Sequence, residues 1–139
     1  MIDKEFAPHP EALELKQLGF DEPCFGYYGV ENEFVLDTMR NTSPNYSRRG
    51  FTSAPLYQQA FRFFREKYSW QHSIDATSDQ HSFELGYNYW IWNNKTGEEH
   101  HTMPKNRPTG DWEYETYKEA ELECLRDLIK ILKGKNNTE

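Results

Sequence analysis

The stretch FELGYNYWIWNN, residues 83–94, decides how the chain folds. It has the composition of a β-strand, in which successive side chains point to opposite faces of a sheet. The face expected to meet the core comprises Phe83, Leu85, Tyr87, Tyr89 and Ile91. The opposite face comprises Glu84, Gly86, Asn88, Trp90 and Trp92. The strand therefore begins polar on one face and ends with large rings on both.

The two indoles on the second face, Trp90 and Trp92, are the strongest functional signal in the chain. Exposed together, they would present roughly 300–500 Å² of ring surface. Apolar patches of that size on a monomer are often functional. We predict that Trp90, Trp92 and Trp112 anchor a partner-binding surface. The alternative is that a loop or the N-terminal helix covers the indoles.

Strands are expected on both sides of this stretch, at residues 70–76 and 98–103, which predicts an antiparallel meander. Helical patterns occupy residues 9–20, 53–68 and 116–134. The strand meander and the helices are separate runs along the chain, as in α+β proteins.

The ends of the first two helices carry recognisable signals. Gly19 is expected to end the first helix, and Phe20 then folds back on Leu15. Ser53 is expected to cap the second helix. A short strand pair, residues 23–29 with 33–36, separates these helices.

The third helix is predicted to begin with a capping box formed by Thr116 and Glu119 and to end at Gly134. Its apolar face comprises Ala120, Cys124, Leu125, Leu128, Ile129 and Leu132. Residues 134–139 are expected to be a frayed tail, and residues 37–53 a long polar loop. The sequence thus predicts a single α+β domain over residues 1–139, with about three helices packed on an antiparallel sheet of three to five strands.

Charge argues against a dedicated duplex-DNA binder. The 139-residue chain has a net charge of -7, and such binders depend on cationic contacts to phosphate. Residues 40–67 are nevertheless basic and aromatic, which makes a single-stranded nucleic-acid module an alternative hypothesis. The side chains concerned are Arg40, Arg48, Arg49, Arg62, Arg65 and Lys67, with Tyr46, Phe51, Phe63 and Tyr68. The simpler interpretation is a solvated helix face, on which Arg62 pairs with Glu66.

A second alternative is a small enzyme with an acid–base site. Its candidate groups would be Asp75, Asp79, His81 and Glu84. No nucleophile motif or phosphate loop accompanies them, so we expect no catalytic residues. The run EEHH, residues 98–101, divides two ligands to each face of a strand and falls short of a zinc site. We expect no metal and no cofactor.

Cys24 and Cys124 match neither a metal-binding nor a redox spacing and are expected to be reduced thiols in a cytosol. Neither a signal peptide nor a membrane-spanning run is visible in the sequence. We therefore expect a cytoplasmic protein without a membrane partner.

Three segments, GFDEPCFGYY (19–28), APLYQQAFRFFREKY (54–68) and TYKEAELECLRDLIKIL (116–132), resemble a group of small proteins encoded by phages and prophages of gut bacteria. The resemblance implies a mobile-element protein that acts on a host component in the cytoplasm of a bacterial host. It carries no catalytic residue across.

Together these patterns favour a non-catalytic protein-interaction factor. Its partner would be a host protein, a phage protein or a second copy of itself. Aromatic anchors would bind within a polar rim, and Arg40, Arg48 and Arg49 would steer the partner electrostatically.

Overall fold

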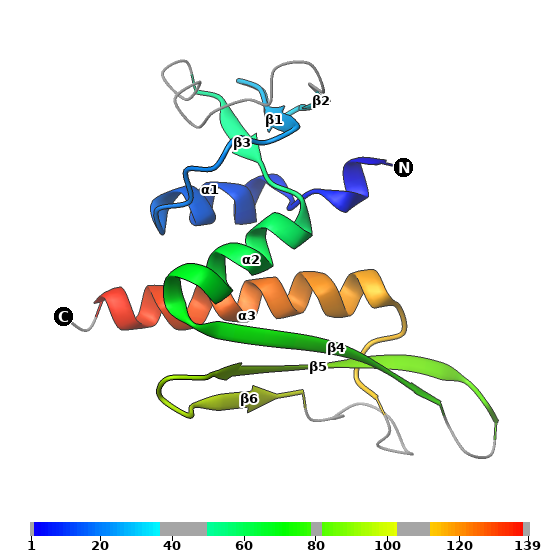
Figure 1. Ribbon diagram of the computed structural model, residues 1–139. Helices are drawn as coiled ribbons and strands as arrows, with labels where there is room; N and C mark the ends of the chain where they lie inside the picture. Colours follow the sequence, from blue (N-terminus) through cyan, green and yellow to red (C-terminus); the bar gives the residue numbers. More distant parts are fainter. Residues whose placement is uncertain (1, 37–49, 79–81, 103–111, 138–139) are drawn as a thin grey trace. The chain divides into compact units, whose positions relative to one another are not determined.

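A computed structural model describes residues 2–36, 50–78, 82–102 and 112–137 (Figure 1). Within these ranges a short 3-10 turn, η1, is followed by three helices and six strands, so the α+β class is confirmed. The strands form two three-stranded antiparallel sheets, β2-β1-β3 and β4-β5-β6, rather than the one sheet expected. In chain order the elements are η1 Ile2–Glu5, α1 His9–Gln17, β1 Gly26–Tyr28, β2 Phe34–Leu36, β3 Thr52–Ala54, α2 Tyr57–Tyr68, β4 Trp70–Ser78, β5 Leu85–Asn93, β6 Glu99–His101 and α3 Tyr117–Asn137.

The chain divides into two compact units, each built around one of the sheets. The first unit comprises Met1–Phe63 and Ile129–Glu139, and the second comprises Phe64–Leu128. Helices α2 and α3 therefore contribute to both units. The single domain over residues 1–139 stays a prediction.

In the first unit, α1 ends as the sequence predicts. The Phe20 backbone N–H donates to the Leu15 carbonyl at 2.9 Å, and the Gly19 N–H donates to Lys16 at 3.1 Å. Gly19 has a φ of 100°, a region that residues with a Cβ rarely adopt. This pair of hydrogen bonds is the Schellman arrangement, and it satisfies carbonyls that would otherwise lack partners.

The small sheet of the first unit is centred on β1. Tyr27 lies opposite Val35 of β2 and opposite Ser53 of β3. The Tyr28 hydroxyl donates to the Ala7 carbonyl at 2.6 Å and so ties the sheet to the segment before α1. The core beneath it comprises Phe6, Ala12, Tyr28 and Ala54, with Phe34 and Leu56 packed against them.

Two expectations for residues 50–56 are wrong. Thr52 and Ser53 belong to β3 rather than to a loop, and Ser53 does not cap α2, which begins at Tyr57. The start of α2 is stabilised instead by Gln59, whose side-chain oxygen accepts from the Leu56 N–H at 3.0 Å. This is the half of a capping box that a glutamine three residues into a helix can supply. Residues 37–49 of the predicted loop lie outside the described residues.

The second unit contains the predicted meander. Strands β4 and β5 pair over nine residues, from Trp70↔Asn93 to Ser78↔Leu85, and β6 pairs with the far end of β5. Asn93 holds the β5–β6 turn: its side-chain oxygen accepts from the N–H groups of Lys95 at 2.9 Å and Thr96 at 3.0 Å. The meander is therefore confirmed.

Helix α3 begins as expected, with the Thr116 hydroxyl accepting from the Glu119 N–H at 3.1 Å. The six predicted apolar-face residues are all buried. The expected end at Gly134 and the frayed tail are wrong in part, because α3 continues to Asn137. Gly134 has no left-handed φ, and a glycine inside a helix costs only about 1 kcal/mol relative to alanine.

The core face predicted for β5 is confirmed only in its second half. Tyr89 and Ile91 are buried, whereas Phe83 is 80% exposed and Leu85 is 51% exposed. The strand begins at Leu85, and Phe83 precedes it with a φ of 58°. Strand alternation therefore does not apply to Phe83, and its predicted place in the core is wrong.

Gly19 and Gly134 both lie near helix C-termini, and alanine should act oppositely at the two sites. We expect Gly19→Ala to lower the free energy of unfolding by about 1–2 kcal/mol, because the positive φ strains a residue with a Cβ. We expect Gly134→Ala to raise it by roughly 0.5–1 kcal/mol, since Gly134 is helical and no atom lies within 4 Å of the added Cβ. Urea denaturation followed by circular dichroism measures both changes. Equal signs would contradict the two helix ends described.

Candidate interaction surface

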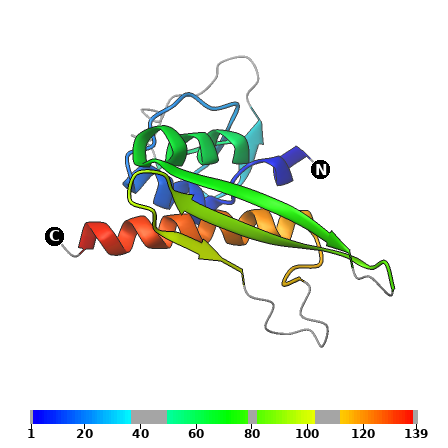
Figure 2. The same cartoon turned by 60° about the horizontal axis from the view of Figure 1, so that its bottom comes forward.

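The sheet of the second unit has one face against a helix and one face away from it. The Tyr89 hydroxyl donates to the Asp127 carboxylate of α3 at 2.9 Å, and the ring of Tyr87 meets the ring of Tyr117 edge-on at 5.8 Å. Burial, together with the charge of Asp127, raises the pKa of Tyr89. Figure 2 shows the α3 segment of this unit along one side of the sheet. Strand alternation then places Trp90 on the opposite, outer face.

Trp90 and Trp92 form a compact aromatic cluster on this outer face. Their ring centroids lie 4.8 Å apart, and the His101 ring stacks on Trp90 at 5.0 Å with an angle of 16° between the planes. The cluster follows from the register, because His101 of β6 lies directly opposite Trp90. Both indoles are partly exposed, so neither is enclosed by the molecule. We call Trp90, Trp92 and His101 the tryptophan surface.

Polar side chains surround the tryptophan surface on the neighbouring strands. Gln71 lies opposite Trp92 and bonds to Asn94 at 3.2 Å. Ser73 lies opposite Trp90 and donates to Asp75 at 3.4 Å. On β6, Glu99 lies 3.5 Å from the His101 ring nitrogen. An apolar centre within a polar rim is the usual anatomy of a protein–protein interface.

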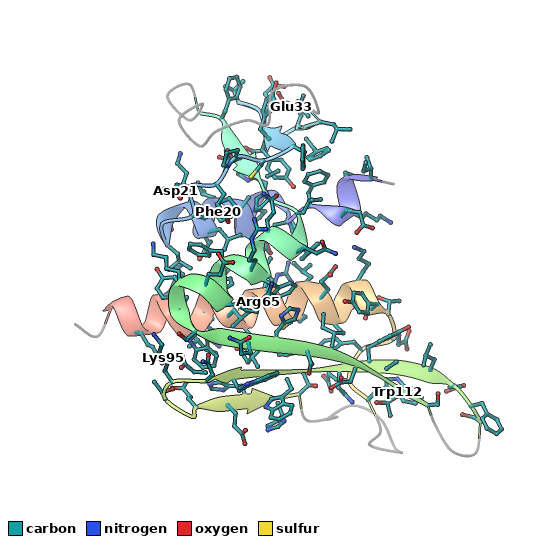
Figure 3. All side chains as sticks on the ribbon, viewed as in Figure 1. Phe20, Asp21, Glu33, Arg65, Lys95 and Trp112 are labelled. Atoms are coloured by element: carbon teal, nitrogen blue, oxygen red, sulfur yellow. The ribbon has the colours of Figure 1, made fainter. Side chains whose placement is uncertain are left out.

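Trp112 does not belong to the exposed surface, so the expectation that it is an exposed aromatic anchor beside Trp90 and Trp92 is wrong. It is only 3% exposed and lies over Gly86, where an added Cβ would come within 1.9 Å of its indole. The chain on either side is fixed to β5: Tyr114 exchanges two backbone hydrogen bonds with Tyr87, and the Glu113 N–H donates to the Asn88 side chain at 2.9 Å. Trp112, labelled in Figure 3, therefore covers the first half of β5. The tryptophan surface lies at the other end of the strand and is not covered by Trp112.

The basic segment 40–67 shows no aromatic platform among its described residues. Phe63 is 7% exposed and packs edge-on against Phe20 at 5.5 Å. Phe51 lies against Tyr27 at 5.4 Å. Both rings serve packing in their own unit, so neither is presented for base stacking.

The cationic groups of that segment are described only on α2. Arg62 pairs with Glu22 at 3.0 Å rather than with Glu66, as the simpler interpretation supposed. The three arginines predicted to steer a partner, Arg40, Arg48 and Arg49, lie outside the described residues.

The two described members of the predicted acid–base cluster, Asp75 and Glu84, do not lie close together. Asp75 lies opposite Asn88, whereas Glu84 precedes the first pair of β5, Leu85 with Ser78. Asn88 and Glu84 are four positions apart, so at the usual rise of a strand the backbones of Asp75 and Glu84 are separated by roughly 13 Å along the hairpin. Both are exposed, and Asp79 and His81 lie outside the described residues.

The EEHH run behaves as a strand with alternating faces. Each histidine pairs with the glutamate two residues before it, His100 with Glu98 at 2.9 Å and His101 with Glu99 at 3.5 Å. Within the ranges that the structure describes, no group of three or more His, Cys, Asp or Glu side chains is arranged to hold a metal ion.

Both cysteines are buried thiols that are not joined in a disulfide. Burial, with a smaller contribution from the charge of Glu22, raises the pKa of the Cys24 thiol to about 12. Burial and the charge of Asp127 likewise raise the pKa of Cys124. Since the thiolate is the nucleophile, both are poor candidates for covalent chemistry at neutral pH.

No protein-family model matches the chain, and neither a curated protein nor a solved structure is significantly similar to it. Among the described helices, none has a segment both long and apolar enough to cross a bilayer.

Two contacts of the outer face were not among the predictions: the stacking of His101 on Trp90 and the close approach of Trp112 to Gly86. Nothing in the sequence indicates that His101 stacks on Trp90, because that contact depends on the β5–β6 register. Gly86 did carry a signal, since an isolated glycine within a strand marks close approach of another group. The approaching group is Trp112.

The contact between Gly86 and Trp112 predicts a coupled pair of substitutions. We expect Gly86→Ala to destabilise the protein by about 1–3 kcal/mol, because the new methyl group would overlap the indole. The same change in a Trp112→Ala background should cost much less. Chemical denaturation of the parent, the two single variants and the double variant measures the coupling, with Gly134→Ala as the matched control. An equal cost in both backgrounds would rule out the described seating of Trp112.

His72, half-buried opposite Ile91, predicts a pH dependence of stability. Burial, and then the charge of Arg65, lower the pKa of His72 to about 4 from the usual 6.5. The unfolded chain therefore binds this proton more readily, so stability contributed by neutral His72 is complete above pH 6.5 and is lost as the pH falls toward 4. We expect His72→Gln to flatten this part of the stability curve. An NMR titration should also show the pKa of His72 rising in the Arg65→Gln variant. This environment would be contradicted if Arg65→Gln left the pKa of His72 unchanged and His72→Gln left the stability curve unchanged.

Proposed function

We propose that this protein is a non-catalytic interaction factor that binds another protein through the tryptophan surface. The observation that carries the proposal is the pair of partly exposed indoles on the outer face, 4.8 Å apart and flanked by the stacked ring of His101. A chain with a mean hydropathy of -0.99 has few apolar groups, yet it places two of the largest on a surface that its own helix does not cover.

The physical argument is that of an interface hot spot. Tryptophan is enriched among the few residues that carry most of the binding free energy, because one rigid ring buries much area at little entropic cost. The contacts of Trp90 with the stacked His101 ring and with the tilted Trp92 ring order these side chains before a partner arrives, which lowers the entropic cost of binding.

The chemistry of the rim indicates what kind of partner fits. Glu99 and Asp75 border the indoles, and cations bind favourably over the face of a tryptophan ring. A partner that presents an arginine or lysine beside an apolar side chain would satisfy both features. Arg40, Arg48 and Arg49 would attract an acidic region of that partner electrostatically and so steer its approach.

The biological setting of the proposal rests on the resemblance to phage and prophage proteins. The resemblance implies the cytoplasm of a bacterial host as the location and a host or phage protein as the partner. The same surface could instead meet a second copy of the chain.

The test is an affinity capture from host lysate followed by calorimetry with the captured protein. We expect Trp90→Ala/Trp92→Ala to weaken binding at least about tenfold, since hot-spot truncations cost about 2 kcal/mol or more. Phe25→Ala, which removes a 41%-exposed ring just before β1 in the first unit, is the matched control and should bind as the parent does. Circular dichroism checks that each variant is folded. Undiminished affinity of the double variant would refute the proposal.

The same preparation should be titrated with single-stranded oligonucleotides over a range of salt concentrations. We expect no tight binding, because the described aromatic rings of the basic segment are packed in their own unit. Tight binding that weakens steeply with salt and is lost in Arg48→Ala/Arg49→Ala would favour the nucleic-acid alternative instead.

A further inference from the structure

The outer edge of β4, at the distal end of the hairpin, is a second unassigned surface of the chain. Strand β4 lies at the end of the sheet order β4-β5-β6, and in the described part of the chain no strand pairs with its outer edge. Exposed strand edges usually carry lysine, proline or a bulge that discourages pairing with another chain. This edge, WQHSIDATS, contains neither lysine nor proline, and its only carboxylate is Asp75.

The hydrogen bonds of β5 show which backbone groups of β4 point outward. The N–H groups of Tyr87 and Asn93 donate toward the β6 side, to Tyr114 and Glu98, and Tyr89 accepts there from Thr102. Backbone groups along an antiparallel strand alternate between its two neighbours. The odd-numbered residues of β5 therefore bond on the β6 side, and its even-numbered residues bond on the β4 side. Their partners on β4 are the odd-numbered residues.

By the same alternation, Ile74, Ala76 and Ser78 direct their N–H and C=O groups away from β5. Ala76 and Ser78 are exposed, and Ile74 is partly exposed. These three residues form an outward row at the distal end of the hairpin. We call them the β4 edge.

We propose that two copies of this chain pair antiparallel through the β4 edge, with Ala76 facing Ala76 across a two-fold axis. In this register Ile74 of each copy faces Ser78 of the other, and the three outward pairs exchange about six backbone hydrogen bonds. Isologous pairing of this kind needs a self-complementary surface, and a two-fold axis is the commonest symmetry of homo-oligomers.

Charge and side-chain size both fit a second copy. Asp75 falls opposite Thr77, so no like charges oppose each other along the pairing. Arg65, whose charge acts on His72, lies toward the start of β4, whereas Glu84 lies near its distal end. Antiparallel pairing brings the distal end of each hairpin toward the start of the other strand, which favours attraction between unlike charges. Alanine at the two-fold axis leaves room for close approach.

Exposed apolar groups beside the β4 edge provide the remaining driving force. Leu85, opposite Ser78 on the neighbouring strand, is 51% exposed. In the proposed register Ser78 of one copy lies beside Ile74 of the other, so Leu85 and the second Ile74 would flank a small serine on one continuous face. Pairing thus extends an apolar face that the monomer leaves uncovered.

The position of Ala76 on the axis gives a charge-swap test. Sedimentation velocity should show a concentration-dependent monomer–dimer equilibrium for the full chain. Ala76→Lys alone and Ala76→Glu alone should each be monomeric, because each places like charges opposite each other. An equimolar mixture of the two should recover a heterodimer. The matched controls, Thr96→Lys and Thr96→Glu in the exposed β5–β6 turn, should dimerise as the parent does.

Three outcomes would overturn the proposal: a parent chain that is monomeric up to sub-millimolar concentration, a dimer that survives both Ala76 substitutions, or a mixture that stays monomeric although both variants are folded by circular dichroism. Loss of the dimer in Trp90→Ala/Trp92→Ala but not in the Ala76 variants would assign self-association to the tryptophan surface instead. The dimer and the capture of a partner are measured separately, so either can fail without the other.

Discussion

The nine-residue pairing of β4 with β5 is the constraint on which the surfaces of the second unit depend. It fixes Trp90 between Ser73 and the β6 residue His101, and it turns Tyr89 and Ile91 toward the core. Because side chains alternate, a slip of one residue would exchange the two faces of the strand. The register is held at one end by the buried side chains of Trp70 and Ile91 and by Asn93, the last residue of β5, whose side chain bonds to the following turn. The same pairing determines that the indoles lie outward and which backbone groups of β4 remain at the edge.

Features governed by neighbouring residues were predictable from the sequence. The end of α1 needs only Leu15, Gly19 and Phe20, and the start of α3 needs only Thr116 and the N–H of Glu119, so each signal is complete within a few positions. The apolar face of α3 likewise follows from its period.

Features governed by distant partners were not predictable. Strand β3 exists because Thr52–Ala54 pairs with β1, and nothing within those three residues indicates it. Trp112 is buried because Gly86, far away in sequence, leaves space for an indole. Phe83 is exposed because the strand begins only at Leu85, a boundary that the alternating pattern did not reveal. For the candidate site, the sequence identified Trp90 and Trp92 on one face but could not say that Trp112 was elsewhere or that His101 joined them.

The way the chain leaves and rejoins β5 has a consequence for protein engineering. It departs at Thr102, whose N–H donates to Tyr89, and it returns at Glu113 and Tyr114, which bond to the adjacent residues Asn88 and Tyr87. Both anchor points are thus fixed to neighbouring positions of one strand, and a connection between them must span only a short distance whatever its length. Lengthening such a closed connection costs little free energy, since the penalty grows only with the logarithm of loop size. An epitope tag or fluorophore-labelling peptide inserted between Thr102 and Trp112 should leave the sheet intact, which gives a handle for following the protein in cells.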